Sequence, residues 1–270
     1  MRPPRWWTAP LLALALHAGA HAATPATVLL EELTWPELRD AQRAGKTTVI
    51  IPVGGTEQSG PQLALGKHNA RVQSLARRIA ESLGNALVAP VVSYVPEGQV
   101  TPPSSHMRFP GTISIPDATF QSLLDAAARS LKQGGFTDIV LIGDHGGYQT
   151  QLKAVAQRLN RDWAATPARA HYVDTYYRIT QTAYVQALRD KGLSPAQIGE
   201  HAGAADTSLT LATAPDLARP EQLAAAAQGA PANGVSGDPR PSSIALGQIG
   251  VDLIVTHTVN AIRQATAARQ

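Results

Sequence analysis

The chain has 270 residues and not one of them is cysteine. Disulfides and thiolate metal sites are therefore excluded, and so is a lipid-anchored lipoprotein, which needs a cysteine to acylate. Lysine and arginine do not cluster with aromatic residues, so no nucleic-acid-binding face is indicated. Any bound metal must be held by histidine and carboxylate groups, donors that suit Zn, Fe or Mn.

Long apolar runs are also scarce, and beyond the N-terminus no segment is apolar enough to cross a bilayer. At the N-terminus, Arg2 and Arg5 precede a short apolar run, and Ala20-His21-Ala22 has the small-x-small form of a signal-peptidase site. We therefore expect residues 1–22 to be a cleavable signal and the protein to be periplasmic or secreted. A retained membrane anchor is the alternative; after cleavage we expect no membrane association.

Removing the signal also removes the excess of positive charge. Without Arg2 and Arg5, 21 basic residues face 20 acidic ones, so the high sequence pI does not indicate a nucleic-acid partner. Roughly 248 residues remain, enough for one α/β domain at 23–270 with a well-buried core. Within it, 214–248 is rich in Ala, Gly and Pro and predicts a long surface loop or excursion.

Strand-like and helix-like segments alternate along the mature chain. Apolar, β-branched runs predict strands at 47–53, 86–95, 138–142 and 169–174. Helical spacing of apolar residues predicts helices at 69–83, 117–134, 148–162 and 251–268. This alternation favours an α/β fold in which helices cover both faces of a mostly parallel sheet, and no internal repeat is present.

Two of the predicted strands end in glycines that lead to a carboxylate and an imidazole. The strand at 47–53 precedes Gly54-Gly55-Thr56-Glu57, with His68 shortly after, and the strand at 138–142 precedes Gly143-Asp144-His145. Strand ends of this kind commonly hold metal ligands or catalytic groups, so the two segments predict one shared site. Histidines in turn-like segments rich in small residues are His68, His106, His145 and His201.

Four blocks of the chain resemble, in the same order, the blocks of the creatininase (creatinine amidohydrolase) family. They are Gly55-Thr56-Glu57-Gln58-Ser59-Gly60-Pro61, Phe109-Pro110-Gly111-Thr112-Ile113-Ser114, Gly143-Asp144-His145-Gly146-Gly147 and His201-Ala202-Gly203-Ala204-Ala205-Asp206-Thr207-Ser208. The resemblance spans about residues 30 to 215. It implies a three-layer α/β/α sandwich, a homohexamer, and metal-dependent hydrolysis of non-peptide C–N bonds in small molecules such as cyclic amides.

The chain departs from the family pattern at several expected metal ligands. Glu57 and His145 match the family's Glu and His. At the positions of the family's other His, its Asp and its two Glu stand, respectively, Ser59, His68, Ala204 and Asp206. The family site holds two metals bridged by the Asp, and most of these changes fall on the second metal.

What remains is Glu57, His68 and His145, one carboxylate and two imidazoles with open positions for water or substrate. From these departures we therefore expect one divalent metal per chain instead of the family's two, first of all Zn, although Fe, Mn or Co would also be accepted. One Zn²⁺ can lower the pKa of its bound water to about 7 and polarise a carbonyl, which suffices for amide hydrolysis.

Four further residues are candidates for the catalytic steps. A general acid or base is expected from Asp144, Asp206 or His201, and an oxyanion contact from His106. Asp144 has two alternative roles, as a fourth ligand or as a group that orients an imidazole. Ser59 lacks the Gly-x-Ser-x-Gly turn of a nucleophilic serine.

The sequence thus predicts a periplasmic metal-dependent hydrolase of a small non-peptide amide, cyclic amide or related carbonyl compound. Creatinine itself is not the expected substrate, because the second-metal ligands are absent. Two alternatives remain: a non-catalytic protein that binds a small molecule in the same site, and an Fe²⁺ centre for oxygen chemistry.

The signal segment generates a direct prediction. Protein recovered from the periplasm of an expressing cell should begin near Ala23, because signal peptidase cleaves after the small-x-small motif. The intact mass and the N-terminal peptide, measured by mass spectrometry, check this. A full-length chain found only in the membrane fraction would instead indicate a retained anchor.

Overall fold

The structure is a computed structural model that describes residues 27–267, so the expected signal at 1–22 lies outside the described residues. The strands are β1 (Thr48–Val53), β2 (Ala86–Val88), β3 (Asp138–Gly143) and β4 (Arg169–Tyr172). The helices are α1 (Trp35–Arg43), α2 (Lys67–Leu83), α3 (Asp117–Gln133), α4 (Gln149–Asp162), α5 (Thr175–Gln181), α6 (Ala183–Asp190), α7 (Pro195–Ile198), α8 (Ala204–Thr213), α9 (Leu223–Gln228) and α10 (Ile244–Ala267). Short 3-10 turns connect several of them, including Ser105–Arg108 and Gly146–Tyr148.

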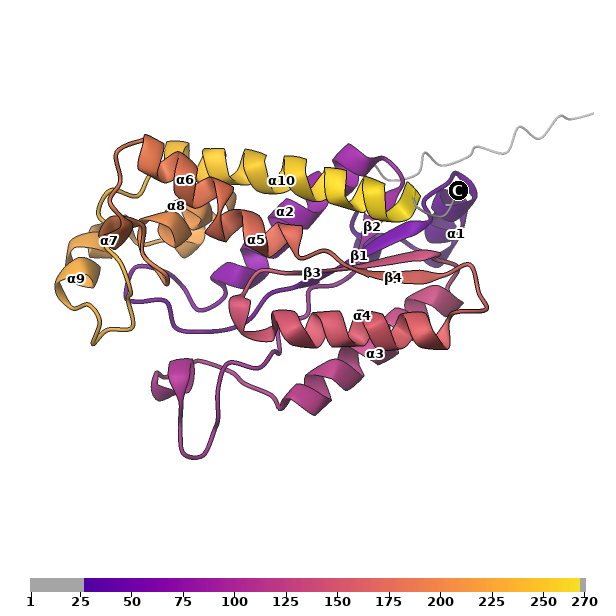
Figure 1. The fold of residues 1–270 in the computed structure, drawn as a ribbon, viewed down its shortest axis with the longest axis horizontal. Coiled ribbons are helices and arrows are strands. Elements are labelled where there is room, and N and C mark those ends of the chain that lie inside the picture. The colour runs from indigo at the N-terminus through magenta and orange to yellow at the C-terminus, as the bar shows by residue number, and fades with distance from the viewer. Residues whose placement is uncertain (1–26, 268–270) are drawn as a thin grey trace, which may run out of the picture.

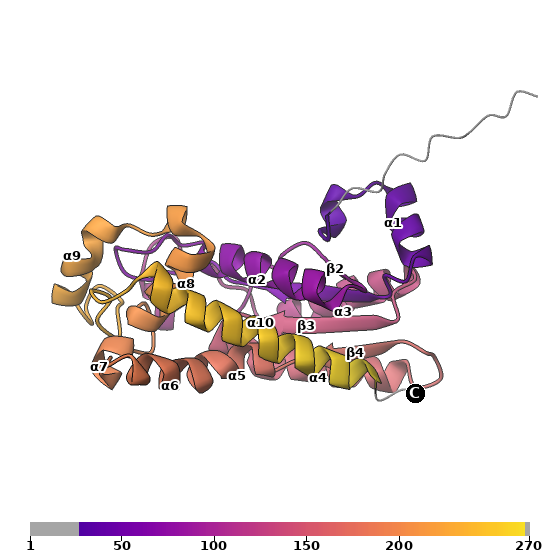
Figure 2. The same ribbon diagram turned by 90° about the horizontal axis from the view of Figure 1, so that it is seen from above.

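The sheet is parallel throughout, in the order β2-β1-β3-β4. Every residue of β1 and β3 is buried, because these continuous apolar runs have helices on both faces. On one face lie α2 and α5, with α10 packed over them, and on the other lie α3 and α4 (Figures 1 and 2). The predicted α/β fold with a mostly parallel sheet is confirmed.

The strand order decides where a site can form. From β1 the chain passes to β2 on one side, and β3 then pairs with β1 on the other side. A crevice opens outside the carboxyl ends of two strands whose connections leave in opposite directions. Val53 and Gly143, the last residues of β1 and β3, are register partners, so the segments carrying Glu57 and His145 emerge side by side.

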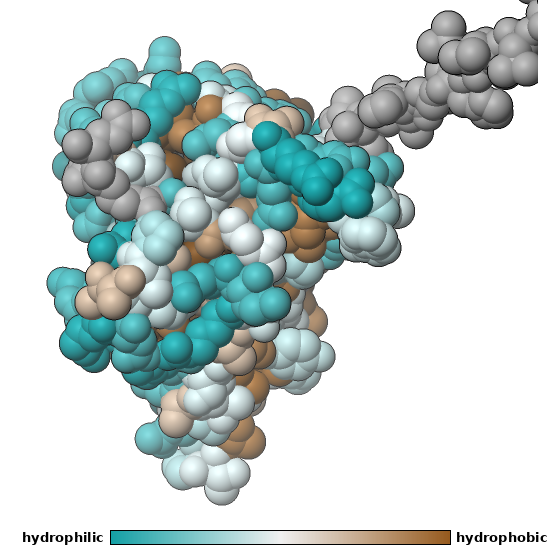
Figure 3. All heavy atoms as spheres, turned by 90° about the vertical axis from the view of Figure 1, so that its right-hand side faces the viewer, coloured by the Kyte–Doolittle hydropathy of each residue, from teal (hydrophilic) through white to brown (hydrophobic). Residues whose placement is uncertain are grey.

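The opposite end of the molecule, where the strands begin, carries mainly hydrophilic side chains with apolar ones between them (Figure 3). Within residues 27–267, no helix has both the length and the apolar character that a membrane crossing requires.

Two element boundaries differ from the sequence-based expectation by more than two residues. The strand expected at 86–95 ends at Val88, because Pro90 follows closely and lacks a backbone donor; beyond it only isolated bridges form, such as Val53 with Val92. The last helix begins at Ile244 instead of residue 251. Gly247 lies inside this helix. A Cβ at this position would lie 1.9 Å from the carbonyl oxygen of Ser208, so glycine permits close packing of α10 on α8.

The expected excursion at 214–248 is partly helical and packs beside the crevice. It contains α9 and the first turn of α10, and its buried residues join a small apolar cluster made of Leu63, Ala202, Ala218, Ala226 and Val235. This cluster connects the excursion to the segment that follows Glu57.

A buried tyrosine fastens the ends of β1 and β3 to each other. The hydroxyl of Tyr148 accepts the backbone N–H groups of Asp144 and His145, both at 3.1 Å. It lies 2.5 Å from the carbonyl oxygen of Gly54 and 2.8 Å from that of Val53, and it can donate to either. Its ring packs on Phe120.

Replacing this hydroxyl tests the connection. We expect Tyr148→Phe to lower the free energy of unfolding by roughly 1–3 kcal/mol, because buried backbone groups lose their partner. Tyr172→Phe is the matched control, since that hydroxyl bonds only the half-buried side chain of Gln149. Chemical denaturation measures both variants, and equal losses would contradict a special role for Tyr148.

Candidate metal centre

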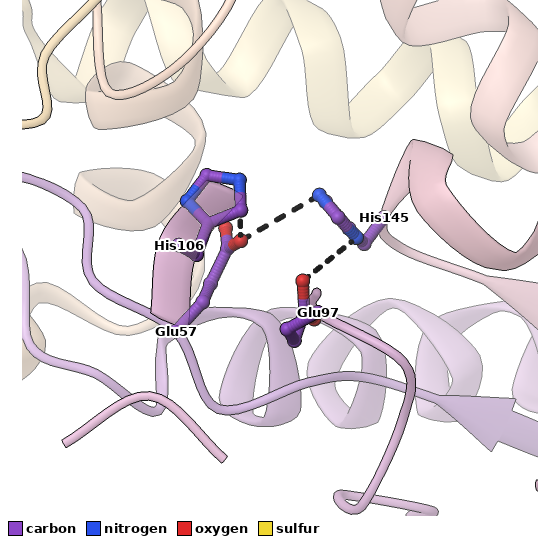
Figure 4. Close-up of side chains that lie close together, drawn as sticks. All are labelled: Glu57, Glu97, His106 and His145. Carbon is purple, nitrogen blue, oxygen red and sulfur yellow. Dashed lines mark ion pairs between the residues drawn. The ribbon is translucent and has the colours of Figure 1, made fainter. Parts of the chain in front are cut away.

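Four side chains converge in the crevice at the ends of β1 and β3. Glu57, Glu97, His106 and His145 each present one potential ligand atom, and these four atoms all lie within 4.8 Å of one another (Figure 4). The Nε2 atoms of His106 and His145 lie 3.3 and 3.5 Å from Oε2 of Glu57. Nδ1 of His145 lies 3.3 Å from Oε2 of Glu97.

The two carboxyl groups are buried without adequate partners. Both side chains are fully inaccessible to solvent. Among residues 27–267, no hydrogen-bond donor reaches Oε2 of Glu57 or either oxygen of Glu97. Buried polar atoms are normally bonded, and unbonded carboxylate oxygens are costly. A cation bound between these oxygens and the two imidazoles would account for the arrangement.

The protonation of the cluster follows from burial. Burial and, after it, the neighbouring charge of Glu57 together raise the pKa of Glu97 to about 9. Although burial opposes it, the positive groups of Lys67 and His68 hold the pKa of Glu57 well below its usual range. Burial lowers the pKa of His145 to about 3 and also lowers that of His106. Both imidazoles are therefore neutral near pH 7, as metal ligation requires.

The donor set fits one divalent ion. Two carboxylates and two neutral imidazoles are the ligands that Zn, Fe, Mn and Co accept in proteins. Glu57 and His145 are in this group, as the sequence analysis expected of the metal ligands. His106 also belongs to the group, although the sequence analysis gave it a role at an oxyanion.

Glu97 is a site residue that was not predicted from the sequence. It lies in the extended segment after β2, within Val95-Pro96-Glu97-Gly98, and belongs to none of the four recognised blocks. The only local signal is a carboxylate between a proline and a glycine at a turn. Its place in the cluster depends on the path of the chain from β2 back over the end of β1.

His68 lies beside the cluster but outside the group of four. It is the second residue of α2, in contrast to the turn-like setting expected for it. Its Nε2 is 2.7 Å from Oε1 of Glu57, and its Nδ1 is 2.5 Å from Oδ2 of Asp144. The ligand role of His68 therefore stays a prediction, and both of its nitrogens face carboxylates.

A buried network of ion pairs surrounds Glu57 and His68. The ammonium of Lys67 is fully buried, 2.5 Å from Oδ2 of Asp206 and 3.4 Å from Oε1 of Glu57. The guanidinium of Arg71 donates to Oδ2 of Asp144 at 2.8 Å and to Oδ1 of Asp206 at 2.5 Å. Both aspartates, the expected acid or base groups, are thus bound by permanent cations.

These cations outweigh the effect of burial on both aspartates. Burial alone would raise the pKa of Asp206, but Lys67 and Arg71 hold it well below the usual range. Burial would also raise the pKa of Asp144, but Arg71 and His68 outweigh it and lower this pKa. Both aspartates are therefore ionised at neutral pH.

His201 completes the surroundings of Glu57. Its Nε2 donates to the backbone carbonyl of Gln58 at 3.0 Å, which leaves Nδ1 as the unprotonated nitrogen, 3.7 Å from Oε1 of Glu57. Burial lowers the pKa of His201 to about 4, so the imidazole is neutral. The side-chain amide nitrogen of Gln58 lies 3.0 Å from Nδ1 of His106.

A small cavity adjoins the cluster. Its volume is about 130 Å³, and its walls include Lys67, His145, Tyr177, His201, Asp206 and Leu209. Most of these groups are polar, and several belong to the ion-pair network. Of the four candidate metal ligands, His145 lines this cavity, which is large enough for a small polar molecule.

Comparison with known proteins gives a consistent picture. The family model described as creatinine amidohydrolase matches residues 31–262. Creatinine amidohydrolase of Pseudomonas putida is 30% identical over 196 residues, which cover 71% of this chain and 74% of that protein. The mycofactocin precursor peptide peptidase of Mycolicibacterium smegmatis is 30% identical over 183 residues, 65% of this chain and 61% of that protein. A solved manganese creatininase matches with a TM-score of 0.72 at 26% identity, over 88% of this chain and 98% of that one.

The paired carboxyl groups generate a prediction on stability. The raised pKa keeps Glu97 protonated in the folded protein, whereas the unfolded chain loses this proton above a pH of about 4.5. Glu97 therefore destabilises the metal-free fold increasingly as the pH rises from about 4.5 to about 9. Glu97→Gln removes this effect. In EDTA, the variant should melt at a higher temperature than the wild type, by a difference that widens with pH over this range.

Excess Zn²⁺ should reverse the order, because the wild type gains stability by binding the ion and the variant lacks one ligand. Thermal melts across the pH range, with EDTA and with Zn²⁺, measure both effects. Equal melting temperatures at every pH in EDTA, or equal stabilisation by Zn²⁺, would contradict the assignment.

Proposed function

This chain belongs to the creatininase family, and we propose that it is a hydrolase that uses one divalent metal ion to cleave the amide bond of a small molecule. The observation that carries the proposal is the group of Glu57, Glu97, His106 and His145, whose carboxylate oxygens are buried without donors and whose imidazoles are neutral. Relatives in this family include amide-cleaving enzymes.

The position of Lys67 supports a single ion. Its ammonium lies between Glu57 and Asp206, so a further metal ion between these carboxylates would have to displace it.

Zinc is the ion we propose, because one or two carboxylates with imidazoles form a common catalytic zinc site, although Fe, Mn or Co would also fit these donors. When bound, the metal supplies a Lewis acid for the carbonyl and a water molecule of lowered pKa. The residues that would hold it are the carboxylates of Glu57 and Glu97 and the imidazoles of His106 and His145.

The remaining groups of the cavity have separable roles. His201 has a free Nδ1 and lies in the cavity wall, so it is the group we propose to accept or return a proton. Asp144 and Asp206 are bound by Arg71 and Lys67, and they hold the wall in place instead of exchanging protons. The phenol of Tyr177 faces the same cavity and can bond a polar group of the substrate.

The cavity supports a small substrate. A volume of about 130 Å³ accommodates a few heavy atoms, and its polar walls suit an amide, a cyclic amide or a related carbonyl compound. We therefore propose a non-peptide substrate and assign no particular compound.

We extend the proposal to the location and assembly of the protein. We propose that it is a periplasmic or secreted homo-oligomer, a hexamer by family resemblance, and that it acts without nucleic acid or membrane.

The decisive measurement is elemental analysis of the protein isolated from the periplasm, with light scattering on the same sample for its oligomeric state. We expect about one metal ion per chain in the wild type. Glu57→Ala and His145→Ala should lose the ion, since each removes a ligand, whereas the exposed His257→Ala should retain it. Chelation should abolish turnover of small amides, and added Zn²⁺ should restore it.

The outcomes separate the possible functions. No metal in the wild type, even after reconstitution, would overturn the hydrolase proposal and leave a binder of small molecules. Two ions per chain would overturn the single-metal proposal. Metal-dependent oxygen consumption with added Fe²⁺, without amide cleavage, would indicate oxygen chemistry.

A further inference from the structure

We propose that Lys67 and His68, the first two residues of α2, are positioning residues that hold Oε1 of Glu57 and thereby leave Oε2 free to bind the metal ion. This inference rests on the proposed metal centre and assigns His68 a role other than that of a ligand. It follows from the different surroundings of the two oxygens of Glu57.

Oε1 of Glu57 is surrounded by groups of the chain itself. Nε2 of His68 lies 2.7 Å from it, and the ammonium of Lys67 lies 3.4 Å from it. Oε2 has no donor of hydrogen-bond geometry within the described part of the chain and points toward Nε2 of His106 and of His145 (Figure 4). One oxygen is thus bound by the protein, and the other faces the candidate ligands.

Both ring nitrogens of His68 already have partners within the chain. Nε2 lies 2.7 Å from Oε1 of Glu57, and Nδ1 lies 2.5 Å from Oδ2 of Asp144 and 2.9 Å from Nη2 of Arg71. Both nitrogens are therefore engaged. His68 connects two carboxylates, Glu57 in front and Asp144 behind.

Asp144 is itself held in a fixed orientation. Its Oδ2 accepts Nε of Arg71 at 2.8 Å, and its Oδ1 accepts the hydroxyl of Tyr176 at 2.8 Å. These three side chains are buried. A continuous series of bonds therefore runs from the rigid core through Asp144 and His68 to Glu57, and it fixes the rotation of the Glu57 carboxylate.

Partners of this kind change metal affinity without binding the metal. Residues that orient a ligand typically alter affinity by about 10–100-fold when they are replaced. A carboxylate released from Oε1 can rotate, and it then pays more orientational entropy to present Oε2. The expected consequence is weaker binding of one ion in an otherwise unchanged coordination environment.

The test is a Co²⁺ titration followed by visible absorption, on the full-length mature protein. The variants are His68→Leu, which removes both bonds, His68→Gln, whose amide can still donate to Glu57, and Asp144→Asn, which preserves shape behind His68. His257→Leu, on the exposed face of α10, is the matched control. Thermal melts establish that each variant is folded.

We expect one Co²⁺ per chain in every folded protein, with the same absorption spectrum at saturation. The dissociation constant should rise about 10–100-fold in His68→Leu, rise to a similar degree in Asp144→Asn, and return most of the way to the wild-type value in His68→Gln. If His68→Leu does not fold, Asp144→Asn and His68→Gln carry the test. The His257→Leu control should match the wild type.

Other results would overturn the inference. A changed spectrum at saturation, or loss of stoichiometric binding in both His68 variants, would make His68 a ligand. Unchanged affinity in His68→Leu, or in Asp144→Asn if the leucine variant does not fold, would exclude positioning. If the wild type binds no Co²⁺, the metal centre and this inference both fail, whereas unchanged variants with a metal-binding wild type overturn the inference alone.

Discussion

The pairing of β1 with β3 is the constraint on which the site depends. Parallel registration of Val53 with Gly143 brings two glycine-containing turns to one crevice, one carrying Glu57 and the other carrying Asp144 and His145. The hydroxyl of Tyr148 fastens these two turns through backbone bonds, and the apolar residues of both strands bury the pair under helices on each face. Without this register, residues almost ninety positions apart in sequence could not share a ligand.

The site then combines two demands that oppose each other. Metal ligation requires carboxylates with free oxygens, but buried free carboxylates destabilise a fold. The chain separates the two by position: Asp144, Asp206 and Oε1 of Glu57 are bound by Arg71, Lys67 and His68, whereas Oε2 of Glu57 and the oxygens of Glu97 are left without donors. The second group therefore forms the part of the site that is prepared for a cation.

The same network gives a physical meaning to the departures from the family pattern. His68 stands where the family pattern has an Asp, and here Lys67 and His68 bind carboxylates of the chain instead of contributing a bridging one. A fixed ammonium between Glu57 and Asp206 supplies positive charge from the protein itself. The single exchangeable cation that we propose agrees with this arrangement.

The sequence alone determined the layers of the fold, the strands β1 and β3, the family, and the pair Glu57 and His145, because apolar periodicity, glycines at strand ends and short motifs are local properties of the chain. Only the tertiary structure decided that Glu97 joins the cluster, that both nitrogens of His68 are engaged, and that Lys67 is fully buried. These contacts depend on the path of segments far apart in sequence. Gly247 shows the same limit: it permits close packing of α10 only because α8 lies against it.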